Sequence, residues 1–218
     1  LPVKAEVRRY TQLRGKPVII IESYGSKDIV LDSSAEAKGV TAGMPLAEAM
    51  SRCKDASLIQ ADAPYYNNTF DNLIKALELR SPTVEKDGLG CAYVGLEGLE
   101  MMYGGEARVI ASLLQAAPAE FNPRVGVAEG KFPAYVAAVS TQGGRATRIP
   151  RDSARTAAFL SGLSIGLLPL SWANKTRLHR FGIHTLGQLS SLPEGAIQAQ
   201  MGTEGRKAWL LASGVDNS

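Results

Sequence analysis

The sequence predicts an α+β fold in three parts, because the pattern of apolar residues changes twice along the chain. Residues 1–61 alternate β-branched runs with short helical segments, residues 62–150 mix helices and strands, and residues 151–218 are helical. With 218 residues and 45% hydrophobic content, the chain can bury a core in each part. We therefore expect a middle part with helices on one face of an antiparallel sheet, followed by a helical last part.

The first part is predicted to hold three strands and two short helices. The β-branched run of residues 16–22 indicates a buried strand, residues 28–32 a shorter partner, and residues 57–60 a third strand. Residues 33–38 and 45–53 are predicted to be short helices on either side of a glycine-containing segment.

The middle part is predicted to run helix, strand, strand, helix, strand, helix. Apolar residues on one face indicate helices over residues 64–80 and 106–116, and residues 131–140 form a third helix with Pro133 in its first turn. Residues 83–86 and 89–95 read as strands, and Asp87-Gly88 between them predicts a two-residue hairpin turn. Residues 124–128 are predicted to form another strand.

The last part is predicted to contain two helix–hairpin–helix turns. Gly182 ends one helix, Thr185 and Gln188 form a capping box that opens the next, and residues 201–205 make a second turn. Backbone N–H groups at such turns bind phosphate without reading sequence. The candidate DNA-binding residues are Lys175, Arg177, Arg180, Gly182, Thr185, Gly202, Gly205, Arg206 and Lys207. The alternative is that these basic residues only solvate a small helical domain.

Composition narrows the function classes without selecting one. A net charge of +3 and a pI near 8.9 permit a nucleic-acid partner but do not require one. Cys53 and Cys91 lie far apart, and His179 and His184 have no Cys or carboxylate pattern beside them, so no metal site is expected. No apolar run approaches the roughly 18 residues of a membrane span, and no signal peptide is visible. We expect a cytoplasmic protein without a membrane partner, and a chain that is a fragment of a longer one.

Several motifs, in order along nearly the whole chain, resemble those of the Y-family (lesion-bypass) DNA polymerases. They are Arg14-Gly15-Lys16-Pro17-Val18, the runs from Ala37 to Pro45 and from Ser81 to Gly95, Gly126-Val127, Phe181-Gly182-Ile183, Leu186 to Leu189, and Ala212 to Asp216. Each motif alone is weak, but their order and spacing are specific. The resemblance implies a fingers-like part (1–61), a palm-like part (62–150) and a thumb-like part (151–218), with the little finger absent from this chain.

The palm hairpin departs from that family at its metal ligands. The family's Asp-Glu pair aligns with Gly90 and Cys91, its preceding Ser with Gly88, and its trailing Asp with Gly95. Two divalent cations about 3.5–4 Å apart drive nucleotide addition in such enzymes. Mg²⁺ needs oxygen ligands, which Gly90 and Cys91 cannot supply. No metal and no catalytic residue is therefore expected here, and the family's first metal-binding Asp would lie before Leu1.

The positions that bind the triphosphate in Y-family polymerases also carry different residues in this chain. The family's Tyr, Arg and Lys align with Ser33, Glu36 and Tyr135, and Glu36 places a negative charge where phosphate would bind. The remaining acids near the hairpin, Asp87 and Glu97 among them, lack the adjacent placement that would rebuild a metal pair. In the first thumb hairpin, Pro169-Leu170-Ser171 replaces the family's Gly-x-Gly, which predicts weak DNA binding there.

This pattern of substitutions is similar to the ImuB class of polymerase-like proteins. The resemblance implies a non-catalytic, nucleoid-associated DNA-binding adaptor without cofactors. It also implies a recombinase-like partner, an error-prone polymerase and the sliding clamp. Two alternatives stay open, namely an active nucleotidyltransferase with an unusual site, for which Mg²⁺ would be expected, and a pure protein-interaction module. Any little-finger and clamp-binding parts are expected beyond Ser218.

Overall fold

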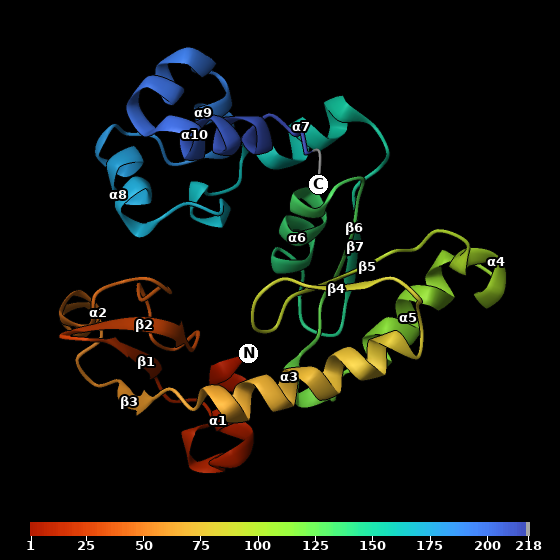
Figure 1. The fold of residues 1–218 in the computed structure, drawn as a ribbon, viewed down its shortest axis with the longest axis horizontal. Helices are drawn as coiled ribbons and strands as arrows, with labels where there is room; N and C mark the ends of the chain where they lie inside the picture. The colour runs from red at the N-terminus through yellow and green to blue at the C-terminus, as the bar shows by residue number, and fades with distance from the viewer. Residues whose placement is uncertain (217–218) are drawn as a thin grey trace. The chain divides into compact units, whose positions relative to one another are not determined.

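The computed structural model describes residues 1–216, and the chain divides into two compact units, Leu1–Pro123 and Arg124–Ser218 (Figure 1). The predicted division at residues 61 and 150 is finer than this and stays a prediction. Within residues 1–216, no helix is both long and apolar enough to cross a membrane.

A three-stranded sheet with order β2-β1-β3 organises the first half of unit 1. Strand β1 pairs antiparallel with β2 and parallel with β3, and the β1–β2 register shifts between Ile20 and Ile21. The β-branched side chains of Val18 and Ile20 are fully buried and pack with Tyr66 and Phe121 in the core of this unit. The elements are α1 (Pro2–Arg9), η1 (Thr11–Leu13), β1 (Val18–Tyr24), β2 (Lys27–Ser33), α2 (Leu46–Arg52) and β3 (Ser57–Gln60).

The second half of unit 1 begins with the long helix α3, which Asp62 caps by accepting a hydrogen bond from the Tyr65 N–H. Tyr66 on this helix donates a hydrogen bond to the buried Glu6 on α1 (2.8 Å), and burial followed by that bond raises the pKa of Tyr66. The elements are α3 (Ala63–Glu78), β4 (Val84–Lys86), β5 (Ala92–Val94), α4 (Leu99–Tyr103), α5 (Glu106–Ala116) and η2 (Ala119–Phe121).

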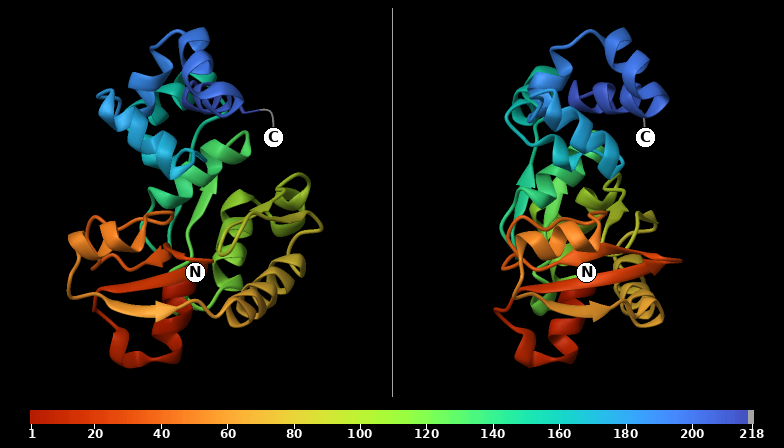
Figure 2. Two further views of the ribbon diagram at one scale, coloured as in Figure 1. Left: turned by 60° about the vertical axis from the view of Figure 1, so that its left-hand side comes forward. Right: turned by 90° about the vertical axis from the view of Figure 1, so that its left-hand side faces the viewer.

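Unit 2 begins with a parallel strand pair and continues as a helical bundle. Strands β6 and β7 pair with the register Val125↔Ala146, and α6 connects them. The buried core includes Leu160, Leu178, Leu186 and Leu189. The elements are β6 (Val125–Val127), α6 (Lys131–Val139), β7 (Ala146–Arg148), α7 (Ser153–Ser161), η3 (Ile165–Leu167), α8 (Trp172–Arg180), α9 (Leu186–Ser190) and α10 (Glu194–Ala212), the last three seen in blue in Figure 2.

Three details of the predicted elements are wrong. The segment of residues 33–38 is not a helix, because Ser33 ends β2 and the Ser34 N–H donates to the Val18 carbonyl of β1 (2.9 Å). The middle part has no single antiparallel sheet, since β4–β5 is a separate antiparallel pair and β6–β7 is parallel. Strand β7 and the helices α1, α4 and α7 were missed. In β7, three residues give too short a pattern to recognise. The other predicted helices and strands are present, with ends displaced by a few residues.

Candidate functional site

The hairpin β4–β5 closes through a loop of residues 87–91, not through the predicted two-residue turn. Lys86 pairs with Ala92, and the Asp87 N–H donates to the Cys91 carbonyl at 3.0 Å. Gly88 and Gly90 both have positive φ (68° and 89°), a backbone that glycine adopts without strain. Gly90 and Cys91 therefore lie in a loop and not in a strand.

The backbone at Gly90 has no room for a side chain. A Cβ built there would lie 2.7 Å from the Cβ of Leu1, closer than real Cβ contacts, and its φ of 89° is strained for any other residue. By contrast, a Cβ at Gly88 would meet no atom within 4 Å. An acidic residue at position 90 would require this loop to move away from the start of α1.

Cys91 is a poor ligand for a hard cation in this loop. Burial, and then the negative charge of Asp87, raises the pKa of the Cys91 thiol to about 11, against a weaker opposing hydrogen bond with Tyr93. The thiol is therefore protonated at neutral pH, and Mg²⁺ prefers oxygen in any case. Within residues 1–216, no group of three or more His, Cys, Asp or Glu side chains is placed to hold a metal ion.

One acid beside this loop was missed by sequence reasoning. Asp32, at the end of β2, accepts hydrogen bonds from the Val3 N–H (3.0 Å) and the Ser33 N–H (2.9 Å). It thus caps the start of α1, next to the Leu1 that Gly90 faces. In the sequence, Asp32 is marked only by its position directly before Ser33. Its contact with α1 depends on the fold and could not be read from the sequence.

The three residues that align with the family's triphosphate-binding side chains do not all lie in the same unit. Ser33 donates its hydroxyl hydrogen to the Val40 carbonyl (2.9 Å), and Glu36 is exposed in the turns between β2 and Val40. Tyr135 lies on α6 in unit 2, half-buried against the helical core. Because these positions belong to different units, the absence of a common triphosphate site stays a prediction.

In unit 2, the α8–α9 turn has the predicted geometry. Gly182 has a φ of 76°, and Thr185 and Gln188 form the capping box, with the Gln188 side chain accepting from the Thr185 N–H at 3.0 Å. The backbone N–H groups of this turn are largely engaged inside it: Gly182 donates to the His179 carbonyl, and the Ile183 N–H donates to the Leu178 carbonyl. DNA contact at this turn would therefore depend on side chains more than on the backbone.

The start of α8 is covered by a carboxylate from this chain. Glu204 accepts hydrogen bonds from the Ser171 N–H (2.7 Å) and from the side-chain amide of Asn174 (2.5 Å). A helix N-terminus attracts negative charge, so this carboxylate takes the place a phosphate would take. The segment Pro169-Leu170-Ser171, which replaces the family's Gly-x-Gly, leads into the same helix start that Glu204 covers.

The second turn interrupts α10 at Gly202, whose φ and ψ of 64° and −148° are non-helical. Gly205 after it is buried, and a Cβ there would lie 2.7 Å from the Met201 Cβ and 2.9 Å from the Ile197 carbonyl. Gly205 therefore serves close packing of the two halves of α10, and any effect on DNA would be indirect.

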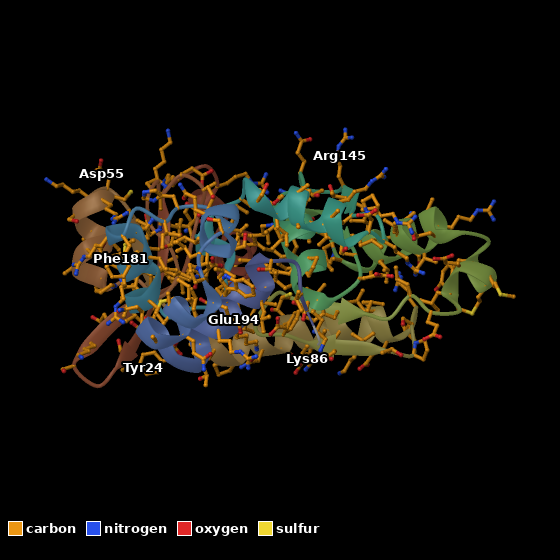
Figure 3. All side chains as sticks on the ribbon, turned by 90° about the horizontal axis from the view of Figure 1, so that it is seen from above. Tyr24, Asp55, Lys86, Arg145, Phe181 and Glu194 are labelled. Carbon is orange, nitrogen blue, oxygen red and sulfur yellow. The ribbon has the colours of Figure 1, made fainter. Side chains whose placement is uncertain are left out.

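The five predicted cations of the helical unit differ in their contacts. Lys175 donates to the Gly166 carbonyl (2.8 Å), and burial lowers its pKa. Arg177 donates to the Gln200 carbonyl (2.9 Å), and Arg206 pairs with Glu194 at 2.7 Å. In the part of the chain that the structure describes, Arg180 and Lys207 are exposed and have no side-chain partner. Figure 3 labels Glu194 at the start of α10 and the exposed Phe181 just after α8.

The fold and the hairpin define a chain like the Y-family DNA polymerases, and comparison with known proteins agrees. Residues 2–139 match the impB/mucB/samB family, so the chain belongs to that family. The DNA polymerase IV of Dehalococcoides mccartyi is 29% identical over 221 residues, covering 99% of this chain and 56% of the relative. DNA polymerase IV 2 of Mesorhizobium japonicum is 28% identical over 207 residues, covering 92% and 48%. The chain thus spans about half the length of these curated relatives.

Solved structures give the same fold. The crystal structure of DinB from Sulfolobus solfataricus has a TM-score of 0.72 and 22% identity, covering 98% of this chain and 64% of that one. The insertion ternary complex of Dbh DNA polymerase has a TM-score of 0.67 and 22% identity, with the same coverage. At this identity the likeness shows the fold alone.

Proposed function

We propose that this chain is the polymerase-like part of a non-catalytic, DNA-binding protein of lesion bypass, of the ImuB class. By that resemblance its partners are a recombinase-like protein, an error-prone polymerase and the sliding clamp, and it works in the cytoplasm on the nucleoid. The protein needs no metal cofactor for this role.

The observation that carries the proposal is the backbone of the hairpin loop. Gly90 adopts a φ of 89° and faces the Cβ of Leu1, so the loop cannot present an acid there without rebuilding. The neighbouring Cys91 thiol is kept protonated by burial. Two-metal catalysis needs carboxylates that bridge both ions. Asp87 is the one carboxylate of this loop, and positions 90 and 91, which align with the family's acid pair, supply none.

DNA binding in this proposal is weak and independent of sequence. Arg180 and Lys207 are the predicted cations without a side-chain partner in residues 1–216, while Glu204 covers the start of α8. Phosphate contacts by exposed cations release counterions, so the affinity should fall steeply with salt.

Two specific observations favour the alternatives. The curated relatives are named DNA polymerase IV, which favours an active polymerase with a divergent site. The engaged N–H groups of the α8–α9 turn favour a module that binds protein partners without DNA.

Primer extension by the full-length protein tests the proposal, with Mg²⁺ or Mn²⁺ and all four nucleotides. The Dehalococcoides mccartyi DNA polymerase IV in the same assay is the positive control. We expect no extension by this protein, together with salt-sensitive binding of the same primer–template. Templated extension would establish the active alternative, and absence of salt-sensitive binding would favour the interaction module.

A further inference from the structure

A short basic segment lies at the start of unit 1. Residues 1–16 hold five Lys or Arg side chains and one acid, an excess of four positive charges, whereas the whole chain has a net charge of +3. The one acid, Glu6, is buried and accepts a hydrogen bond from Tyr66, so it does not face solvent beside these cations. Unit 2 is basic as well, with eleven Lys or Arg and five Asp or Glu, whereas unit 1 as a whole holds 13 cations and 16 acids. Residues 1–16 are therefore a local basic segment in a unit that is otherwise acidic.

The backbone that carries these cations is tightly turned. Helix α1 ends with Arg8 and Arg9, and three short-range hydrogen bonds then fold the chain through η1: the Leu13 N–H to the Tyr10 carbonyl, the Arg14 N–H to Thr11, and the Lys16 N–H to Leu13. We call Arg8, Arg9, Tyr10, Arg14 and Lys16 the α1–η1 surface. All five are exposed, and the red segment that carries them is visible in both views of Figure 2.

Most of this surface has no compensating acid. Within residues 1–216, Arg14 and Lys16 have no side-chain hydrogen bond or ion pair, and Arg8 contacts only the Phe121 ring, 5.6 Å from its centroid. Arg9 is the exception, since it pairs with Asp62 at 2.9 Å. Glu120 adjoins Phe121 in sequence but forms no ion pair with Arg8.

An exposed aromatic ring lies among these cations. Tyr10 is 41% exposed, and the Arg9 guanidinium lies 5.4 Å from its ring centroid and 5.0 Å from that of Tyr65. The Arg9 guanidinium thus makes a cation–π contact with the Tyr10 ring. Cations interleaved with an exposed aromatic ring suit a strand with unstacked bases, because the cations bind phosphates and the ring stacks on a base.

We propose that the α1–η1 surface binds single-stranded nucleic acid without reading its sequence. Arg8, Arg14 and Lys16 contact successive phosphates, and Tyr10 stacks on a base. This site lies in unit 1 and goes beyond the proposed function, which places DNA contact in the helical unit. A single strand fits better than a duplex, because only its bases expose a face to Tyr10.

The test uses the 218-residue chain and a fluorescein-labelled 20-nucleotide oligo(dT), with anisotropy measured between 50 and 200 mM NaCl. The test variant is Arg8→Gln/Arg14→Gln/Lys16→Gln. The control Lys27→Gln/Lys38→Gln/Arg145→Gln removes the same charge from exposed cations elsewhere. We expect Kd to rise about tenfold or more for the test variant, and the salt slope to fall by about 2, from roughly 0.7 per phosphate contact. The control should change Kd less than about threefold.

Two further comparisons decide what kind of partner is bound. Tyr10→Ala should raise Kd several-fold while Tyr10→Phe leaves it unchanged, because stacking needs the ring and not the hydroxyl. Polyglutamate of equal charge should compete poorly. Equal effects in the test and control triple variants would overturn the proposal, as would an unchanged Tyr10→Ala or full competition by polyglutamate, which would indicate an acidic protein partner. Arg180→Gln/Lys207→Gln reports separately on the helical unit, so the two sites can fail independently.

Discussion

The hairpin β4–β5 in unit 1 and the α8–α9 turn in unit 2 were both predicted, by resemblance, to match functional motifs of Y-family polymerases, but their backbones are held differently. The α8–α9 turn is fixed by local bonds, above all the capping box of Thr185 and Gln188. The hairpin loop depends on the left-handed backbone of Gly88 and Gly90 and faces the distant Leu1. The capping-box turn is fixed by residues close in sequence, whereas the hairpin loop leaves no room for an acidic side chain at position 90.

The largest effect is expected where strand β6 and helix α6 of unit 2 pack against each other. A Cβ at Gly126 on β6 would lie 1.9 Å from the Ala134 carbonyl oxygen and 2.5 Å from the Ala138 nitrogen on α6. Gly126→Ala should therefore lower the free energy of unfolding by about 3 kcal/mol or more, because backbone must move. Urea denaturation measures this. Gly162→Ala, in open space with an ordinary φ of −82°, is the control and should be nearly neutral.

The hairpin loop itself can be tested with two glycines. Gly90→Ala should destabilise the chain by about 1–3 kcal/mol, from its positive φ and its close approach to Leu1. Gly88→Ala shares the positive φ but meets open space, so its cost should be smaller, about 1 kcal/mol. Equal costs for the two would mean that Leu1 does not constrain the loop.

Restoring the acids at the hairpin should not restore synthesis. Gly90→Asp/Cys91→Glu places carboxylates on a strained loop and leaves Ser33, Glu36 and Tyr135 unchanged. Primer extension by this double variant of the full-length protein should stay at background. Robust extension would show that the hairpin acids alone decide activity.

The helix start covered by Glu204 gives a smaller effect. Glu204→Ala removes the acceptor of the Ser171 N–H and should destabilise unit 2 by about 1 kcal/mol. The same change should raise DNA affinity a few-fold, because the negative charge leaves the helix N-terminus. Glu78→Ala, at the exposed end of α3 in unit 1, removes the same charge elsewhere, and an equal rise for both variants would contradict a specific role of Glu204.

The smallest effect is expected from the cations at the second turn. Arg206→Ala/Lys207→Ala should weaken binding of all DNA sequences alike and flatten the salt slope by about one unit for each phosphate that is no longer bound. Because Arg206 pairs with Glu194, Lys207→Ala alone should account for most of the weakening. Binding that changes for one sequence only would indicate base contacts.

Features set by neighbouring residues were predictable from the sequence, and features set by distant ones were not. The capping box at Thr185 and the turn at Gly182 follow from local chemistry, and both are confirmed. The hairpin turn at Asp87-Gly88 was wrong because Gly90 also adopts a left-handed backbone. The cap by Glu204 was missed because it joins residues 33 positions apart.

The measurement that tests the central claim most directly is a Mn²⁺ titration of the full-length protein, followed by electron paramagnetic resonance, with and without nucleotide. Mn²⁺ takes the same oxygen ligands as Mg²⁺. Because the hairpin loop offers Gly90 and a protonated Cys91 thiol, we expect no site with a Kd below about 1 mM, a threshold set by the weakness of sites with few carboxylates. Stoichiometric binding of one or two Mn²⁺ ions at micromolar concentration, abolished by changes around residues 87–91, would contradict the account.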